Sequence, residues 1–173
     1  MGIFDFFKKQ KTTVIPDNNP EKVLSQQSNK AYERHRVAGT SYRKDAIISL
    51  GTKNNDYELN KSQLIKKNLI DTPVYEYVFN PSSVSLVPEP DNEHDANAIK
   101  VILDGVHVGY IKKGSCSHVK NLLSSNKIQS ISAKIFGGNC KYVRCYDDCG
   151  DKDSYTLEKE KSDFGVEITL LLN

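Results

Sequence analysis

Apolar and polar residues alternate along much of the chain beyond residue 31, and a period of two residues is typical of strands. Residues 73–79 alternate in this way, and residues 84–90 follow after a Pro-Ser-Ser turn, so we expect these two segments to pair as a hairpin. Pro88 and Pro90 should end its second strand. Further strands are expected at residues 34–39, 128–136, 142–146, 154–157 and 164–172.

The clearest local signal is the segment 98–111, AIKVILDGVHVGYI, which predicts a second hairpin. Asp104 and Gly105 at its centre suit a two-residue type I′ turn, because both tolerate the positive φ that this turn needs. The turn also sets the register of the two strands. We therefore expect three cross-strand pairs, namely Leu103 with Val106, Val101 with Val108 and Ile99 with Tyr110.

Three segments carry apolar residues at helical spacing instead. Residues 44–51 predict a short helix that stops at Gly51, and residues 62–68 predict another helical turn. A third helix is expected after Ser115 as N-cap, with one apolar face and its end near Asn126. That face comprises Cys116, Val119, Leu122 and Leu123. Many short strands with a few brief helices predict a mainly β fold, either a small antiparallel barrel or an open sheet.

With 173 residues, 38% of them hydrophobic, the chain is long enough for one packed domain and a tail. Residues 1–30 combine a short Phe-rich start with Pro, Asn, Gln and Ser, so we expect a flexible, disordered leader before a domain at residues 31–173. No segment approaches the ~18 apolar residues of a membrane span, and no signal peptide is recognisable. Four cysteines without an export signal favour reduced thiols and a cytoplasmic location.

The formal net charge of +2 hides an uneven distribution of charge along the chain. Residues 111–146 carry seven cations and no Asp or Glu, which is a composition that attracts phosphate backbones. The same cations are equally consistent with a solvated surface that meets acidic segments in the fold. They are Lys112, Lys113, Lys120, Lys127, Lys134, Lys141 and Arg144.

Motifs of catalysis are missing from the sequence. It contains no G-x-x-x-x-G-K-[ST], no G-x-G-x-x-G, no G-x-S-x-G and no H-E-x-x-H. The four histidines are scattered, and none neighbours a Ser or Cys in a pattern that marks a nucleophile and its base. We therefore predict a protein that is not an enzyme.

Two metal hypotheses arise from the acidic and cysteine-containing segments. Oxygen-bearing side chains alternate over residues 91–97 as in a calcium loop, but Ala96 stands where that loop needs Gly. The cysteines lack the close C-x-x-C pairs typical of zinc sites. We expect no cofactor, with zinc left as an open alternative. Its ligands would be Cys140, Cys145 and Cys149, with Cys116 or His118 as the fourth.

Aromatic and basic side chains are interleaved near the predicted strand ends. Stacking faces beside cations suit a single strand of nucleic acid, because every base has a flat apolar face and every linkage carries an anion. Their convergence depends on the fold, and the aromatic residues of the predicted strands could equally belong to the core. The rings are Tyr42, His94, Tyr110 and Phe136, and the cations are Arg43, Lys112 and Lys113.

Four motifs, taken in order, resemble a known family. VAGTSYR, LVPEPDNEHDANAIKV, GVHVGYIKK and AKIFGG are similar to the HIRAN domain, found in the eukaryotic helicase-like transcription factor and as free-standing bacterial proteins. The core D-N-x-x-D-x-N-A-I-x-V followed by V-G-Y is specific. The resemblance covers about residues 34–138, with an insertion at residues 51–72. It implies a modified OB-like antiparallel β-barrel with small helices, in agreement with the strand pattern.

The resemblance also implies a ligand, the free 3′ end of single-stranded DNA. It implies that Tyr42 and His94 lie against the terminal bases and that Asp95 accepts a hydrogen bond from the 3′ hydroxyl. A carboxylate at that place would repel a 3′ phosphate. The remaining roles that it implies are Asn92 as the brace of that loop or a base partner, Tyr110, Lys112 and Lys113 at phosphates, and Phe136 closing the pocket.

Two positions depart from the pattern of DNA-binding members. His94 replaces a larger aromatic residue, and Ser41 replaces an arginine, although Arg43 follows two positions later. Because stacking contributes ~1 to 3 kcal/mol per base, a poorer platform would weaken binding about tenfold or more.

We therefore expect a module that binds single-stranded DNA at its 3′ hydroxyl end. Without a helicase motor in the sequence, it would act as an adaptor in DNA repair or processing, together with a helicase, nuclease or other protein partner. The alternative is a protein-interaction module with a vestigial DNA pocket, whose leader or acidic C-terminal half docks onto a partner. A zinc-dependent or metal-supported protein is the third hypothesis.

Overall fold

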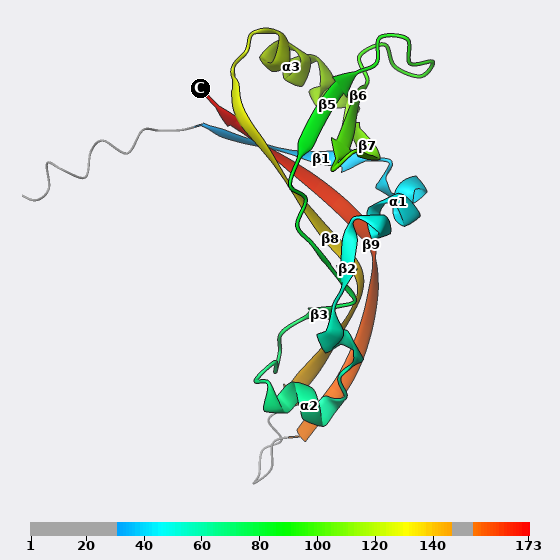
Figure 1. Ribbon diagram of the computed structural model, residues 1–173, viewed down its shortest axis with the longest axis vertical. Helices are drawn as coiled ribbons and strands as arrows, with labels where there is room; N and C mark the ends of the chain where they lie inside the picture. Colours follow the sequence, from blue (N-terminus) through cyan, green and yellow to red (C-terminus); the bar gives the residue numbers. More distant parts are fainter. Residues whose placement is uncertain (1–30, 147–153) are drawn as a thin grey trace, which may run out of the picture.

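Strands with a few short helices make up the part of the chain that the computed structural model describes, residues 31–146 and 154–173 (Figure 1). The expected leader, residues 1–30, lies outside the described residues. In chain order the elements are β1 (Tyr32–Ala38), η2 (Thr40–Arg43), α1 (Lys44–Ser49), β2 (Gly51–Lys53), η3 (Asn55–Glu58), α2 (Lys61–Lys66), β3 (Val74–Tyr75), β4 (Tyr77–Phe79), β5 (Val84–Pro88), β6 (Ile99–Leu103), β7 (Val106–Ile111), α3 (Lys113–Ser124), β8 (Ile128–Tyr146) and β9 (Ser154–Leu172). The expected fold class, mainly β with small helices, is confirmed.

Seven of the strands form one sheet in the order β3-β8-β9-β1-β7-β6-β5, and β2 pairs separately with β4. All the pairings between named strands are antiparallel. The sheet curls until β5 lies against β8 (Figure 1). Within the described residues no ladder of hydrogen bonds joins these two strands, so the expected barrel stays open along that seam.

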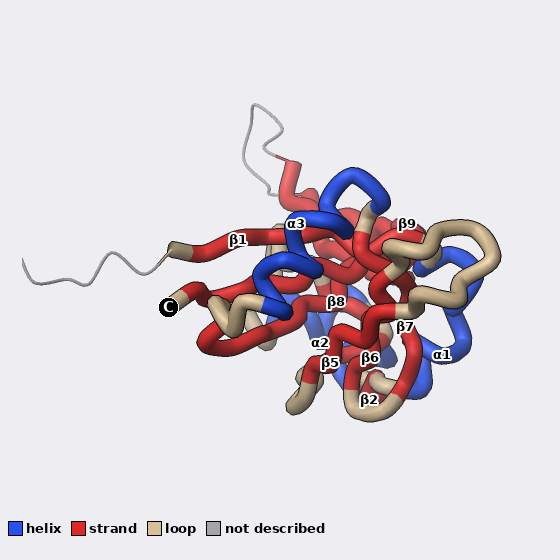
Figure 2. Tube along the Cα trace, turned by 90° about the horizontal axis from the view of Figure 1, so that it is seen from above, coloured by secondary structure: helices blue, strands red, loops and turns tan. Residues whose placement is uncertain are grey.

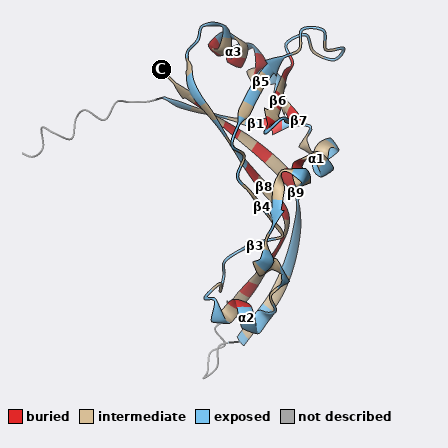
Figure 3. Cartoon of the chain, in the orientation of Figure 1, coloured by how far each residue is buried: buried red, intermediate tan, exposed pale blue. Residues whose placement is uncertain are grey.

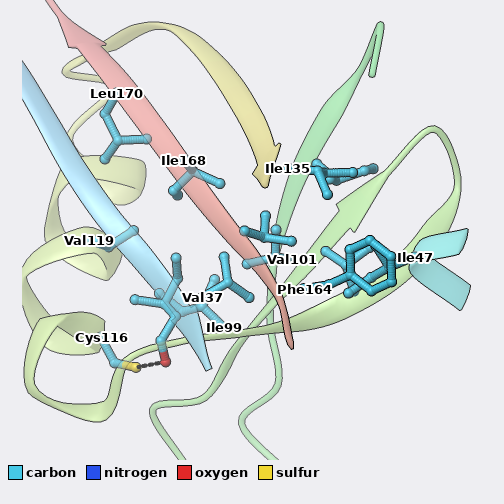
Figure 4. Close-up of a cluster of buried hydrophobic side chains, with 14 of the residues drawn as sticks. Val37, Ile47, Ile99, Val101, Cys116, Val119, Ile135, Phe164, Ile168 and Leu170 are labelled. Atoms are coloured by element: carbon cyan, nitrogen blue, oxygen red, sulfur yellow. Dashed lines mark hydrogen bonds between the residues drawn. The ribbon is translucent and has the colours of Figure 1, made fainter. Parts of the chain in front are cut away.

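The inner face of the curled sheet and one face of α3 enclose the main core. Fifteen buried residues form this cluster, which runs from α3 across β9 to α1 (Figures 3 and 4). The alternation of β9 explains the packing, because Val166, Ile168 and Leu170 point inward while the residues between them face outward. We call this part the body: β1, β5 to β7, α1 and α3, with residues 128–136 of β8 and 164–172 of β9.

The same two long strands then leave the body and continue as an arm (Figure 1). The arm is residues 138–146 of β8 and 154–162 of β9, together with η3, α2 and β3. Gly137 and Gly138 mark the departure with φ angles of 87° and 90° and an irregularity in the β8–β9 register. A Cβ on Gly137 would lie 2.2 Å from the Asp163 carbonyl oxygen, so the bend requires glycine.

A separate cluster of three buried residues, Leu64, Val74 and Val143, holds the arm together. Leu64 belongs to α2, which begins with a capping box between Asn60 and Gln63. The segment 51–72, which the family resemblance implies to be an insertion, supplies β2, η3 and α2. Much of the arm therefore rests on that segment.

The first expected hairpin, between residues 73–79 and 84–90, is wrong. The first segment divides into β3, which pairs with β8, and β4, which pairs with β2, whereas β5 pairs with β6. The division follows from long-range hydrogen bonds, since the Glu76 N–H donates to the Asn139 carbonyl and the Asn54 N–H donates to the Glu76 carbonyl. Local alternation does not distinguish between such partners.

Other predicted elements are confirmed with changed boundaries. The first strand and the helices after residues 43 and 60 are present as β1, α1 and α2. The buried face of α3 is confirmed, but Ser115 is not its N-cap: the helix begins at Lys113, and the Ser115 N–H donates to the Lys112 carbonyl. The four short strands expected after residue 127 are two strands of 19 residues each. No helix in the described ranges is long and apolar enough to cross a membrane.

Candidate nucleic-acid interface

The β6–β7 hairpin sets the direction of Tyr110. Its turn at Asp104 and Gly105 is confirmed, with φ angles of 46° and 82°, and Leu103 pairs with Val106 as expected. Beyond Ile102 the register shifts by one residue, so that Tyr110 pairs with Lys100 rather than with Ile99. The shift is a bulge, and because of it the two expected pairs of Val101 with Val108 and of Ile99 with Tyr110 are wrong.

The bulge has a direct consequence for the surface. Ile99 is fully buried, whereas Lys100 is only half-buried, so a residue opposite Lys100 faces outward. Gly109 makes the bulge possible, because a Cβ there would lie 2.3 Å from the Ala38 carbonyl oxygen and its φ is 149°. The V-G-Y sequence thus turns the Tyr110 ring out of the core.

The loop between β5 and β6 protrudes from the body beside β7 (Figures 1 and 2). Its own side chains hold its shape. Asn92 Oδ1 accepts hydrogen bonds from the N–H groups of His94 and Asp95 at 3.0 and 3.1 Å. Asp95 Oδ1 accepts from the Asn97 N–H at 2.9 Å, and the Asp95 carbonyl accepts from the Ala98 N–H at 2.8 Å. These Asx turns explain why Asn and Asp stand at these positions.

Two adjoining hollows lie where this loop meets β7 and α3. The first, of about 420 Å³, extends from the loop to the start of α3, and the second, of about 580 Å³, lies over the first half of the loop. The first hollow is lined by Ala38, Asn92, His94, Asp95, Ala98, Tyr110, Ile111, Lys113 and Cys116. Asn92, His94 and Tyr110 line both hollows, so these three residues form their shared wall.

Charged and aromatic neighbours surround the Tyr110 ring. The Arg43 guanidinium lies 6.0 Å from the ring centroid, and the His107 ring meets it edge-on at 4.9 Å. His107 Nε2 lies 3.0 Å from the Gly109 carbonyl oxygen, which only accepts, so Nε2 carries a proton. Burial, and then the charge of Arg43, lower the pKa of His107 from its ordinary value, which leaves the imidazole neutral at pH 7.

The carboxylate of Glu89 connects the β5–β6 loop to the neighbouring strand. Glu89 pairs with Lys100 and accepts a hydrogen bond from Asn92 Nδ2 at 3.2 Å. These contacts, with the Lys100 hydrogen bond the largest and a further bond from Tyr110, lower the pKa of Glu89. Glu89 therefore stays ionised and ties the loop to β6.

The structure brings together some of the residues predicted from the sequence and separates others. Asn92, His94, Asp95, Tyr110 and Lys113 line one hollow, and Arg43 approaches it through Tyr110. The residues outside it are Tyr42, which is 94% exposed on η2, Lys112, which directly precedes α3, and Phe136, which lines a different hollow beside β3 and β4. Phe136 lies on β8, and β9 and β1 stand between it and β7.

Sequence reasoning missed three residues of this site, namely Glu89, Lys100 and His107. Glu89 lines the second hollow, whereas Lys100 and His107 line neither hollow and act through Glu89 and Tyr110. A charged Lys100 inside an apolar strand was the one visible signal, because a lysine there marks the outward face of β6.

The three described cysteines of the zinc hypothesis are divided between α3 and the arm. Cys116 lies on the buried face of α3, where its Sγ donates to the Ile111 carbonyl at 3.3 Å and burial raises its pKa (Figure 4). Cys140 and Cys145 lie on β8 in the arm, and Cys149 lies outside the described residues. Over residues 31–146 and 154–173, no group of three His, Cys, Asp or Glu side chains is placed to hold a metal ion.

Comparisons with known proteins identify one family. The family model of the HIRAN domain matches residues 34–149. Among solved structures, the crystal structure of the HIRAN domain of human HLTF is similar at 18% sequence identity and a TM-score of 0.37, covering 82% of this chain and 74% of that chain. A comparison with curated proteins gives no match.

Proposed function

Because the chain belongs to the HIRAN domain family, which is generally associated with DNA binding, we propose that it binds the free 3′ hydroxyl end of single-stranded DNA. A HIRAN domain binds and does not catalyse, so the proposal concerns recognition alone. The binding site is the hollow between the β5–β6 loop, β7 and α3. One observation carries the proposal: the bulge at Gly109 turns the Tyr110 ring outward beside the loop that presents Asp95.

Asp95 supplies the discrimination between strand ends. Its Oδ1 is used within the loop by the Asn97 N–H, whereas Oδ2 has no hydrogen-bond partner among the described residues. A terminal 3′ hydroxyl would donate to Oδ2, in a charge-assisted hydrogen bond. A 3′ phosphate would bring negative charge to the same carboxylate and be repelled.

Aromatic faces and cations supply the rest of the affinity. Tyr110 and His94 line the shared wall of the two hollows, where they offer flat surfaces for the terminal bases. Lys113 at the start of α3 and Arg43 beside Tyr110 would meet the backbone phosphates. The exposed ring of Tyr42, next to Arg43 on η2, would extend the stack at the rim.

We assign the chain the role of an adaptor in DNA repair or processing. A site for a strand end, without catalytic motifs in the sequence, suits a protein that brings a helicase, a nuclease or another enzyme to that end. We further propose that the protein is located in the cytoplasm of a bacterial cell, which is the compartment that contains the DNA.

Fluorescence anisotropy with a labelled short single strand tests the proposal. We expect tighter binding of a 3′ hydroxyl strand than of the same strand with a 3′ phosphate. Asp95→Asn keeps the acceptor for the Asn97 N–H and removes the charge, so it should abolish this preference, a loss of roughly ten- to hundredfold for the hydroxyl strand. Asp45→Asn removes an exposed carboxylate from α1 and should leave the preference unchanged.

Added salt provides the second readout. Contacts from Arg43 and Lys113 to two phosphates predict that the logarithm of the association constant falls with the logarithm of salt concentration at a slope of about −1.4. Equal affinity for both strand ends would contradict the proposal. Absence of binding at low salt would contradict it as well, and would favour the protein-interaction module.

A further inference from the structure

The outward face of the sheet continues beyond the hollow. In β1, Val37 points into the core while Arg34, Arg36 and Ala38 are exposed. Ala38 is the direct partner of Tyr110 across the β1–β7 ladder. Because residues directly opposite each other in an antiparallel pair lie on one face, Tyr110 and the exposed residues of β1 share the outer face.

The same face extends across the next two strands to Phe136. Arg36 lies opposite Glu167 of β9, and Glu167 lies opposite Lys134 of β8. Phe136 is two residues beyond Lys134 and pairs with Gly165. The Arg36 guanidinium covers the Phe136 ring at 4.5 Å, which shows that both side chains lie on this surface. Tyr110 and Phe136, although in different hollows, therefore belong to one face.

Positive charge predominates on this surface. Glu167 is the one carboxylate among the outward residues 32–38 of β1, 165–171 of β9 and 130–136 of β8. It pairs with Arg36 at 3.3 Å. Arg34 and Lys134 stay exposed, and a neutral pair, Thr169 and Ser132, lies between them across the ladders. We call Arg34, Arg36, Lys134 and Phe136 the band.

An aromatic groove of about 380 Å³ begins where the band ends. It is lined by Lys134 and Phe136 of β8 and by Tyr75, Tyr77 and Phe79 of β3 and β4. Tyr75 is 37% exposed, so part of its ring is available for contact. The groove lies at the junction of the body and the arm, which is the far end of the band from Tyr110.

We propose that the band and the aromatic groove form a track for the nucleotides upstream of the 3′ end of a bound single strand. This inference rests on the proposed function, because the hollow fixes the strand end from which the track is followed. Cations for phosphates beside rings for bases are the combination by which proteins hold single strands without sequence preference. Arg36 over Phe136 repeats the arrangement of Arg43 over Tyr110.

The width of the sheet between β7 and β8 determines how many nucleotides the band can hold. Three steps separate β7 from β8, and at about 4.8 Å per step they span roughly 14 Å. A stacked strand advances about 3.4 Å per nucleotide, so the band accommodates roughly four nucleotides beyond the hollow. The groove then adds a stacking surface for further bases.

A length series of 3′ hydroxyl strands, of about 3, 6, 9 and 12 nucleotides, tests the track by anisotropy at low salt. We expect affinity to rise with length and to level off beyond about 9 nucleotides. The double variant Arg36→Gln/Lys134→Gln should weaken the 12-mer about tenfold or more, reduce its salt slope by about 1.4 and leave the trimer unchanged. Arg34→Gln changes one exposed cation without disturbing the pair between Arg36 and Glu167 and should weaken the 12-mer alone.

The matched control removes two exposed cations from the arm, Lys66→Gln/Lys159→Gln, and should behave as wild type. Tyr75→Ala should weaken the 12-mer roughly five- to hundredfold, whereas Tyr75→Phe retains a stacking ring.

The outcomes separate the two proposals. A trimer that binds with 3′ hydroxyl preference, together with a 12-mer that binds no tighter, would overturn the track and leave the hollow standing. Equal affinities of the band variant and the arm control for the 12-mer would do the same. A 12-mer that binds through the band without preference for a strand end would overturn the hollow instead, and absence of any binding would overturn both.

Discussion

The body and the arm use the same two strands in different ways. In the body, β8 and β9 form part of a sheet that curls over a cluster of fifteen buried residues, whereas the arm encloses three among the described residues (Figure 3). Gly137 and Gly138 separate the two regions without interrupting the strands. Strand pairing is thus continuous through both regions, whereas the buried apolar surface that stabilises it is much larger in the body than in the arm.

The two regions also treat charge differently. In the body, Glu89, Lys100 and the Asx turns of the β5–β6 loop hold a hollow open at the surface. In the arm, Lys141 is buried, with its Nζ donating to the Leu59 carbonyl and lying 5.1 Å from the Tyr57 ring centroid. This hydrogen bond connects the end of η3 to β8, and burial lowers the pKa of Lys141. Lys113 of the body lines the candidate hollow, whereas Lys141 of the arm holds two elements of the fold together.

Removing core volume should give the largest effects and show whether the two regions unfold together. Leu170→Ala in the body and Leu64→Ala in the arm each remove a fully buried side chain, at a cost of about 2 to 5 kcal/mol. Leu170→Ala should lower the global free energy of unfolding in a urea titration. Leu64→Ala should instead speed amide hydrogen exchange in the arm and leave exchange in β6 and β7 unchanged. Uniformly faster exchange in both variants would show that body and arm form one cooperative unit.

The second-largest effect is expected on DNA affinity, when an aromatic ring is removed from the body or from the arm. Tyr110→Ala should weaken binding of a 3′ hydroxyl trimer by about 1 to 3 kcal/mol, because one stacking platform is lost. Tyr142→Ala is the matched change in the arm, where Arg144 covers the ring at 4.3 Å, and it should leave the affinity unchanged. The comparison is measured by anisotropy, with circular dichroism as the check on folding. An equal loss in both variants would remove the distinction between the regions.

A smaller effect is expected from acid, and it arises in the body. Hydrogen bonds from the side chain and N–H of Ser82, and from Ser83, lower the pKa of Asp104 to about 2 from its ordinary value of 3.8. The ionised carboxylate therefore stabilises the fold above pH 3.8, and this contribution is lost as the pH falls toward 2. Asp104→Asn tolerates the φ of 46° and should lower Tm at pH 7.

The sign of this effect is tested by thermal melts between pH 7 and pH 2. The difference in Tm between wild type and Asp104→Asn should shrink steadily below pH 4. A difference that stays constant down to pH 2 would show that the carboxylate charge contributes nothing to the hairpin.

The smallest effect should come from the charge network of the arm. Arg144 lies 3.7 to 3.8 Å from carboxylate oxygens of Asp71, Glu158 and Glu160, at partly exposed positions. Such pairs contribute less than about 1 kcal/mol each and are screened by salt. Arg144→Gln should therefore speed amide exchange in the arm only slightly, and the difference from wild type should vanish at high salt. A large effect that persists in salt would mean that ion pairs, rather than Leu64 and Val143, hold the arm.

Local signals in the sequence predicted the parts of the fold that depend on neighbours in the chain. The Asp104-Gly105 turn, the buried face of α3 and β1 all follow from short patterns. The bulge at Gly109 was missed because its cause, the close Ala38 carbonyl, lies on a strand far away in the sequence. The hairpin expected from residues 73–90 failed for the same reason, since β3 and β4 find partners in β8 and β2.

The residues of the candidate site also fall into those that the sequence predicted and those that only the fold identifies. Family resemblance named Asn92, His94, Asp95, Tyr110 and Lys113, and the structure places all five around one hollow. The distance of Phe136 from that hollow follows from strand order, which a linear motif does not contain. His107, Glu89 and Lys100 lie within the motif segments but were given no role there, because only the folded arrangement shows which residues they contact.

A titration of the isotope-labelled protein with a 3′ hydroxyl trinucleotide, followed by backbone amide NMR shifts, tests the central claim most directly. Binding in the hollow predicts shifts at His94, Asp95, Tyr110 and Lys113, with the arm residues Leu64 and Val143 unmoved. Shifts confined to the arm, or an unchanged spectrum at saturating trinucleotide, would contradict a 3′ end site in the body.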